Sequence, residues 1–344
     1  MDAKYIVDIL VRLLETPSPT GMAEAAVDLV ADEASRLGFA FERTPKGAGI
    51  VRLEGREKGD LRTVSGHVDT LGAMVRSINK SGTIRLTPLG GYSFHSIDGE
   101  YCTLHSRPGD FRGTILSTHA SVHVFEDART QVREEKNIEI RLDAEVKEKK
   151  DVEDLGVRPG DYVSFDPRVE ITRTGFVKSR HLDDKAGVAI MLAALEHYRS
   201  AGLKPLLPSA LYVTTYEEVG HGAAPVPPGT REFLSIDMGA VGEDLSTDEY
   251  RVSICAKDSG GPYDRRMTSR LVDLAEKHEI PHAVDIYPFY GSDAGAARRA
   301  GHEILAGLIG PGVHASHSME RTHTKALEAT LSLLLAYLDS PPVG

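Results

Sequence analysis

Two adjacent glutamates, Glu217 and Glu218, stand at the end of a β-branched and aromatic run that begins at Leu211. Such a run predicts a buried strand. Neighbouring residues in mid-strand point to opposite faces, and an unpaired buried carboxylate is costly, whereas at a strand's carboxyl end both side chains can reach one cleft. Open α/β sheets bind their ligands at that edge. Glu217 and Glu218 are therefore candidates for acid–base or metal chemistry.

Residues that bind metals recur at four other strand or loop ends. They are His67 with Asp69, Asp183 or Asp184, Asp237, and His317. Two histidines and several carboxylates, with no cysteine among them, suit two Zn²⁺, Co²⁺ or Mn²⁺ ions better than a structural zinc. Paired ions activate a water and polarise a carbonyl, and a spare carboxylate can serve as general base. Each residue taken singly has a structural explanation, but five such positions together favour a dinuclear site.

Alternating strand and helix patterns from residue 180 onward predict an α/β fold with a mixed sheet flanked by helices. Helices are expected at Lys4–Glu15, Met22–Leu37, Val188–His197, Tyr263–Lys277, Ala294–Arg299 and Glu320–Tyr337. Strands are expected at Phe39–Glu42, Gly49–Leu53, Leu61–Ser65, Leu211–Gly220, Arg231–Asp237, Arg251–Ala256, Ala283–Tyr287 and Ile304–Ile309.

Helical periodicity nearly disappears between Leu71 and Val163, where short alternating runs are separated by glycine-containing turns. This pattern predicts a small all-β domain inserted into the α/β chain. We therefore expect a catalytic domain made of residues 1–70 and 165–344, interrupted by a β-rich domain at residues 71–164.

Composition narrows the classes of partner. The 344 residues are 41% hydrophobic and 26% charged, with a formal net charge of -11. An acidic balance argues against nucleic acid or an anionic membrane as partner. The two cysteines give no disulfide framework, the first ten residues lack a signal-peptide pattern, and no apolar run is long enough to span a membrane. The expected location is cytoplasmic.

Six motifs in order carry a family resemblance. They are Gly66-His-Val-Asp69, His181-Leu-Asp-Asp-Lys-Ala-Gly187, Glu217-Glu-Val-Gly220, Ser235-Ile-Asp237, Gly291-Ser-Asp-Ala294 and His317-Ser-Met-Glu320. With them, nearly the whole chain resembles the M42 metallo-aminopeptidases, which include tetrahedral and glutamyl aminopeptidases. The resemblance implies a zinc-exopeptidase-like fold and hydrolysis of N-terminal residues from peptides. It also implies a β-domain that mediates dimer contacts, with dimers assembling into a hollow dodecamer.

The resemblance further implies a role for each site residue. Two divalent ions, most often zinc or cobalt with manganese as a further option, would be held by His67, Asp183, Glu218, Asp237 and His317, with Asp183 bridging them. Asp69 would orient His67, and Glu217 would be the general base.

Other interpretations remain. A metal-dependent deacylase acting on N-acyl amino acids or small amides would use the same chemistry, and it stays open as the main alternative. A glycosidase would leave the histidines without a purpose, and a non-catalytic binding protein would not need Glu217. His278-Glu-Ile-Pro-His282 matches the HExxH zinc motif, but Pro281 disfavours the helix that this motif requires. His119 and His123 are expected on the β-domain surface.

Overall fold

The main sheet carries the predicted site at the carboxyl ends of its parallel strands. The computed structural model describes residues 3–344, so Met1 and Asp2, the start of the predicted catalytic domain, lie outside the described residues. Within this range ten strands form the sheet, in the order β1-β2-β12-β3-β13-β18-β15-β16, with β14 paired to β18 and β17 paired to β15. Their bounds are β1 (Phe41–Arg43), β2 (Gly49–Leu53), β3 (Leu61–His67), β12 (Ser209–Thr214), β13 (Thr230–Ile236), β14 (Gly239–Ala240), β15 (Val252–Asp258), β16 (Gly261–Pro262), β17 (His282–Ile286) and β18 (Leu305–Val313).

Strand β3 lies between β12 and β13 and is parallel to both, and β13 is parallel to β18. The carboxyl ends of these four strands therefore meet at one edge. The outer pairs, β2 with β12 and β15 with β18, are antiparallel. The predicted mixed α/β sheet is thus confirmed.

Helices cover both faces of this sheet. Strand β12 is apolar on both faces. Leu211 and Val213 belong to one buried cluster, and Ala210 and Tyr212 belong to another on the opposite face. This alternation is the period of a strand buried on both sides. The helices that contribute to the first cluster are α1 (Ala3–Glu15), α2 (Glu24–Arg36), α4 (Leu182–Ala201), α5 (Arg265–Lys277) and α7 (Thr324–Leu338), whereas α6 (Asp293–Arg299) contributes to the second.

Helix α4 is the central helix of the α/β domain. Every residue from Leu182 to Leu195 is buried, and the helix packs against α1, β3 and α7. Alanine, leucine and isoleucine dominate this stretch, so helix propensity and burial agree. Its first turn lies at the carboxyl edge of the sheet, where the Asp183–Asp184 peptide bond is cis.

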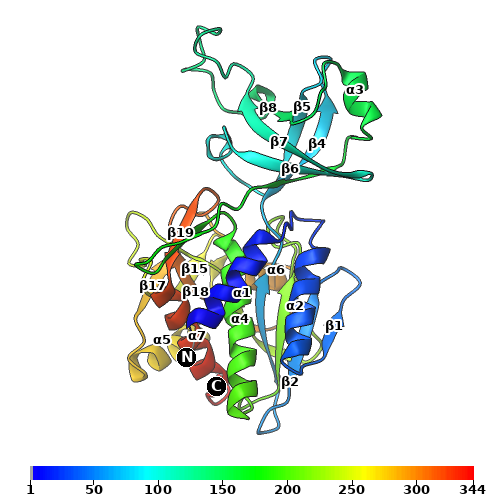
Figure 1. Cartoon of the computed structure of the whole chain (residues 1–344). Helices are drawn as coiled ribbons and strands as arrows, with labels where there is room; N and C mark the ends of the chain where they lie inside the picture. The colour runs from blue at the N-terminus through cyan, green and yellow to red at the C-terminus, as the bar shows by residue number, and fades with distance from the viewer. Residues whose placement is uncertain (1–2) are drawn as a thin grey trace.

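The inserted segment forms a closed antiparallel barrel with its own core, and Figure 1 shows it at one end of the α/β domain. Its strands are β4 (Gly72–Ile78), β5 (Ile84–Leu89), β6 (Tyr101–Ser106), β7 (Gly109–Ser117), β8 (Ile138–Leu142) and β9 (Tyr162–Phe165), accompanied by α3 (Lys149–Asp154) and the short 3₁₀ helices η1 (Phe94–Ser96) and η2 (Glu135–Asn137). The predicted all-β insert is confirmed as a fold element, while its boundaries at residues 71 and 164 stay a prediction.

The predicted closing helix was wrong at its start. Residues Glu320–His323 form strand β19, which pairs with β11 (Phe176–Ser179) in a small sheet completed by β10 (Glu170–Ile171), and α7 begins only at Thr324. A long-range strand pairing overrides local helix preference here. The strand predicted at Leu211–Gly220 ends at Thr214, and the strand predicted at Ile304–Ile309 continues to Val313.

Among residues 3–344 no helix is both long and apolar enough to cross a membrane.

Candidate metal centre

One carboxylate, that of Asp183, lies between the two predicted metal-binding histidines. His67 Nε2 is 3.2 Å from Asp183 Oδ1, and His317 Nε2 is 3.3 Å from Asp183 Oδ2. His67 ends β3, Asp183 lies in the first turn of α4, and His317 lies in the loop between β18 and β19. The fold therefore brings residues far apart in sequence to the two oxygens of a single carboxylate.

Three more predicted residues surround this core. Glu218 Oε2 is 3.7 Å from His317 Nε2, and Glu217 Oε2 is 3.7 Å from His67 Nε2. Two groups of possible metal ligands result, His67 with Asp183 and Glu218, and His67 with Glu217 and Asp237, and in each group the ligand atoms lie within 4.8 Å of one another. All five residues predicted to bind metal, together with Glu217, thus gather at one place.

Asp69 lies behind the histidine and holds two parts of the site together. Its backbone carbonyl lies 2.9 Å from His67 Nδ1, which fits a hydrogen bond from this nitrogen and a free Nε2 toward Asp183. Its carboxylate accepts hydrogen bonds from the backbone N–H groups of Glu217 at 3.2 Å and Glu218 at 3.4 Å, and from the Thr20 hydroxyl at 2.6 Å. Asp69 therefore positions both glutamates.

Two carboxylates without an assigned role also brace the site. Asp184 accepts hydrogen bonds from the backbone N–H groups of His67 at 3.2 Å and Gly187 at 3.1 Å, so its carboxylate holds the end of β3 against the first turns of α4. Glu320 accepts hydrogen bonds from the backbone N–H groups of Asp183 at 3.1 Å and His317 at 3.0 Å. The Asp183-Asp184 pair and the motif ending in Glu320 could be recognised in the sequence. Which of these carboxylates faces the histidines and which bind backbone N–H groups could not be predicted.

Asp293 fixes the loop that carries the two glutamates. It is buried at the start of α6, accepts a hydrogen bond from the Thr214 hydroxyl at one end of the loop and another from the Ala223 N–H, at 2.8 Å, at the other end. Ser292 caps this helix, since its hydroxyl oxygen accepts a hydrogen bond from the Gly295 N–H. Asp293 is a supporting residue that sequence reasoning missed.

The site concentrates negative charge in a buried place. Burial and the neighbouring Asp237 carboxylate raise the pKa of Glu217 well above its ordinary value, although His67 opposes this. Burial and Asp183 raise the pKa of Asp237 to about 8. Burial lowers the pKa of His317, but hydrogen bonding to Asp183 outweighs this and raises it to about 10. Bound cations would relieve this crowding of carboxylates.

The donor set fits divalent metal ions. Imidazole nitrogens and carboxylate oxygens, with no thiolate among them, suit zinc, cobalt or manganese. Both cysteines, Cys102 and Cys255, are buried elsewhere and free. The side chains at the site can therefore hold metal.

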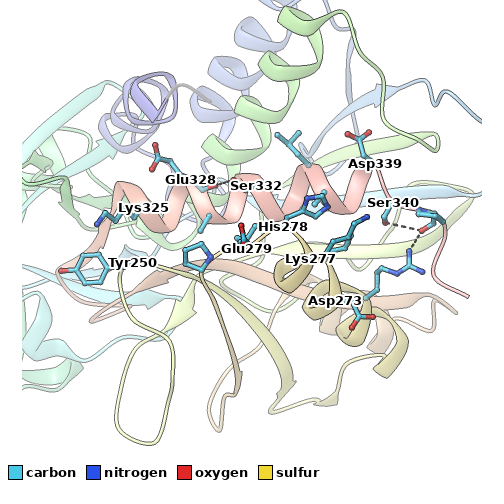
Figure 2. Close-up of a pocket in the computed structure, with 18 residues that line it drawn as sticks. Tyr250, Asp273, Lys277, His278, Glu279, Lys325, Glu328, Ser332, Asp339 and Ser340 are labelled. Atoms are coloured by element: carbon cyan, nitrogen blue, oxygen red, sulfur yellow. Dashed lines mark hydrogen bonds between the residues drawn. The ribbon is translucent and has the colours of Figure 1, made fainter.

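A cavity of about 650 Å³ opens onto these residues. Asp183, Glu217, Glu218, Asp237 and His317 are among the residues that line it, together with mainly apolar residues of the loops after β13 and β17, residues of the His317 loop, and Arg299. A larger cavity of about 970 Å³ lies between α5 and α7, and Figure 2 shows its lining, which includes none of the predicted site residues. Of these two cavities, the smaller one is therefore lined by the candidate metal ligands.

The remaining histidine motifs do not contribute to the site. His278 caps the end of α5 and His282 begins β17, so the HExxH match is not helical. His119 pairs with Asp127 on the barrel surface at 2.8 Å, and His123 is exposed. Both histidines lie in turns of the segment between β7 and β8.

The chain is similar to a known family of peptidases. The family model described as M42 glutamyl aminopeptidase matches residues 47–333. The Bacillus subtilis protein YhfE, provisionally named an aminopeptidase, is 45% identical over 338 residues, which cover 98% of each chain. Two solved structures share the fold. The TET aminopeptidase of Thaumarchaeota archaeon SCGC AB-539-E09 has a TM-score of 0.88 at 18% identity, covering 97% of this chain and 96% of that one.

The TET1 peptidase of Pyrococcus horikoshii has a TM-score of 0.86 at 21% identity, covering 98% of this chain and all of that one, 100%. At such identities these two structures support the fold, whereas the family model and YhfE support the family. Together with the clustered histidines and carboxylates, they show that the chain belongs to the M42 family of peptide hydrolases.

Proposed function

We propose that the chain is a dinuclear metal-dependent aminopeptidase that releases N-terminal residues from peptides. The single observation that carries this proposal is the placement of His67 and His317 at opposite oxygens of Asp183. One carboxylate flanked by two imidazoles is the arrangement expected of a ligand shared by two ions.

Asp183 would be the shared ligand of the two ions. His67 and Asp237 would complete one site, and His317 and Glu218 the other. Such ions supply a Lewis acid that polarises a carbonyl and makes water a better nucleophile at neutral pH. Because zinc, cobalt and manganese share these ligand types, the donor set does not choose among them.

Glu217 would act as general base. Its Oε2 lies 3.7 Å from His67 Nε2, its side chain lines the cavity, and its backbone N–H donates a hydrogen bond to Asp69. Burial and Asp237 raise the pKa of Glu217, so its carboxylate is a better proton acceptor than an ordinary glutamate. The proton taken up at Oε2 would then pass to the amine that leaves.

A deacylase would use the same metal chemistry, and similarity to aminopeptidases favours the aminopeptidase over this alternative. The carboxylates of Asp183, Glu218 and Asp237 in the cavity wall would be occupied by the two ions, and Arg299 also lines the cavity. The charge of the wall therefore does not select between a free and an acylated amino terminus, and the choice of substrate decides between the two activities.

The test compares three substrates after a chelator has been removed and Co²⁺ or Zn²⁺ has been added. An aminoacyl-p-nitroanilide should be hydrolysed, whereas the same anilide with an N-acetyl group and an N-acetylated amino acid should not. Preferential hydrolysis of the N-acetylated amino acid would favour the deacylase instead. A panel of anilides with different side chains would identify the preferred N-terminal residue.

Assembly into a homo-oligomer is part of the proposal, with dimers forming a dodecamer in the cytoplasm. It rests on similarity, because the Pyrococcus horikoshii TET1 peptidase is described as assembling into a tetrahedron or a large octahedral shell. The barrel would supply the dimer contacts.

A further inference from the structure

The inserted barrel reaches into the proposed metal site. The backbone carbonyl of Gly91, in the loop after β5, accepts a hydrogen bond from His317 Nδ1. This bond leaves Nε2 as the nitrogen that faces Asp183 and Glu218. The preceding residue, Gly90, lies so close to Glu218 that a Cβ added there would be 3.4 Å from the Glu218 side chain.

Gly90 could not be replaced without disturbing this approach. It has a φ of +77°, and a Cβ at this position would lie 2.5 Å from Leu71 Cδ2. Gly90 thus lets the barrel's backbone come close to Glu218, and the next residue, Gly91, reaches His317 through its carbonyl.

The loop is also tied firmly to the barrel. The Tyr92 hydroxyl donates a hydrogen bond to the Gly72 carbonyl at 2.9 Å. Its ring makes edge-to-face contacts with Phe94 and Phe165, at centroid distances of 5.9 and 5.4 Å. Any shift of the barrel against the catalytic domain would therefore move the Gly91 carbonyl as well.

Arg180 joins this loop to the loop of His317. One guanidinium nitrogen, Nη2, donates to the Ser96 carbonyl of the barrel and lies 3.4 Å from Glu100, and the other, Nη1, donates to the Ser318 carbonyl at 3.4 Å. Only 5% of its side chain is exposed. Since Ser318 follows His317 directly, Arg180 holds the barrel loop and the histidine loop at a fixed separation.

The two histidines differ in what holds them. His67 is 1% exposed, ends a central strand, and makes its Nδ1 contact within the catalytic domain, to Asp69. His317 is 38% exposed, has a φ of +63° in a loop, and makes its Nδ1 contact with the barrel. A change in barrel position should therefore affect His317 and leave His67 unchanged.

We propose that the barrel is a working part of the metal site, with Arg180 as the positioning residue that aligns the Gly91 carbonyl with His317. The affinity of one of the two metal equivalents then depends on the barrel, and that of the other does not. This inference rests on the proposed dinuclear function.

The test is a Co²⁺ titration of metal-free protein, followed by the visible absorption of the bound ion. Arg180→Met should weaken one equivalent by roughly 10- to 100-fold, the usual effect of removing a group that orients a metal ligand. The other equivalent should keep its affinity. Arg180→Lys keeps the charge but loses the fork that reaches both carbonyls, so it should recover the affinity only in part.

Arg168→Met is the matched control. Arg168 also binds Glu100, at 2.8 Å, but its side chain is 60% exposed, and among residues 3–344 it forms no hydrogen bond with the Ser96 or Ser318 carbonyl. Both equivalents should bind this variant as they bind the wild type. Thermal unfolding identifies variants that fail to fold. If Arg180→Met does not fold, Tyr92→Phe replaces it in the titration, because this variant removes only the hydroxyl hydrogen bond to Gly72. Tyr92→Phe should show the same selective loss of affinity for one equivalent.

The outcomes separate this inference from the proposed function. If the wild type never binds a second equivalent, the dinuclear proposal fails. If the wild type binds two equivalents but folded Arg180 and Tyr92 variants weaken both equally, or neither, the inference about the barrel is wrong and the dinuclear proposal stands.

Discussion

Glu217 is the carboxylate whose surroundings best suit proton transfer. It lies at the cavity, its backbone N–H is held by Asp69, and burial together with Asp237 raises its pKa. Glu217→Gln should lower kcat by about 10²- to 10⁴-fold, because an amide cannot accept the proton. Steady-state kinetics on an aminoacyl-anilide would measure this loss.

Metal content distinguishes a lost base from a lost ligand. Elemental analysis should find the same number of ions in Glu217→Gln as in the wild type, whereas His67→Ala and Asp237→Ala should lose metal. Glu243→Gln, at an exposed position of a nearby loop, should leave both kcat and metal content unchanged. Full activity in a metal-loaded Glu217→Gln enzyme would show that the base is another residue.

The identity of most site residues could be predicted from the sequence, whereas the orientation of their side chains could not. The positions of His67, Glu217, Glu218, Asp237 and His317 followed from motif order and strand ends. From the residues alone, Asp183 and Asp184 could not be told apart, since only their backbone geometry sends one toward the histidines and the other toward N–H groups of His67 and Gly187. The roles of Glu320 and Asp293 depend on contacts with distant loops that no local pattern records.

At the level of elements, Glu33 joins α1 to α2. Its buried carboxylate accepts hydrogen bonds from Tyr5 at 2.7 Å, Arg12 at 3.2 Å and Arg36 at 2.6 Å. Burial raises the pKa of Glu33, but hydrogen bonds from Arg36, Tyr5 and Arg12 outweigh burial and lower it to about 2. The carboxylate therefore stabilises the packing of the first two helices.

The pH dependence of this contribution has a definite sign. Because the folded-state pKa lies below the ordinary value of 4.5, the stabilisation is complete above about pH 4.5 and is lost as the pH falls toward 2. Glu33→Gln should lower the free energy of unfolding by roughly 1–3 kcal/mol at pH 7. Urea unfolding at several pH values should show this difference shrinking below about pH 4.5.

Glu24→Gln is the matched control for that series, since Glu24 lies in the first turn of the same helix and is exposed. It should change the free energy of unfolding by less than about 0.5 kcal/mol. A constant difference between wild type and Glu33→Gln across the acid range would contradict the assigned role of the Glu33 charge.

Elements with strong periodicity were predictable, and elements set by long-range contacts were not. The start of α7 was misplaced because β19 exists only through its pairing with β11. Strand β18 continues through Gly310, where a Cβ would lie 1.7 Å from the Asp237 carbonyl oxygen, so this glycine lets the strand pass beside a proposed metal ligand. The predicted strand ended at Ile309, one residue before this glycine.

At the scale of the whole molecule, similarity to the TET peptidases predicts that several copies of this chain assemble, which the structure of a single chain does not show. Light scattering coupled to size exclusion should give a single species with twelve times the mass of one chain. Removal of the barrel's contacts by substitution of its exposed valines, Val122 and Val124, by aspartate should reduce this mass if the barrel supplies the dimer interface. A monomeric wild type would contradict the predicted assembly.

Anomalous diffraction from crystals grown with Zn²⁺ or Co²⁺ tests the convergence of the histidines on two ions most directly. Two peaks roughly 3.5–4 Å apart should appear on either side of the Asp183 carboxylate, one bound by His67 and the other by His317. A single peak, or peaks that leave His67 or His317 without a metal in crystals of active enzyme, would contradict the dinuclear site.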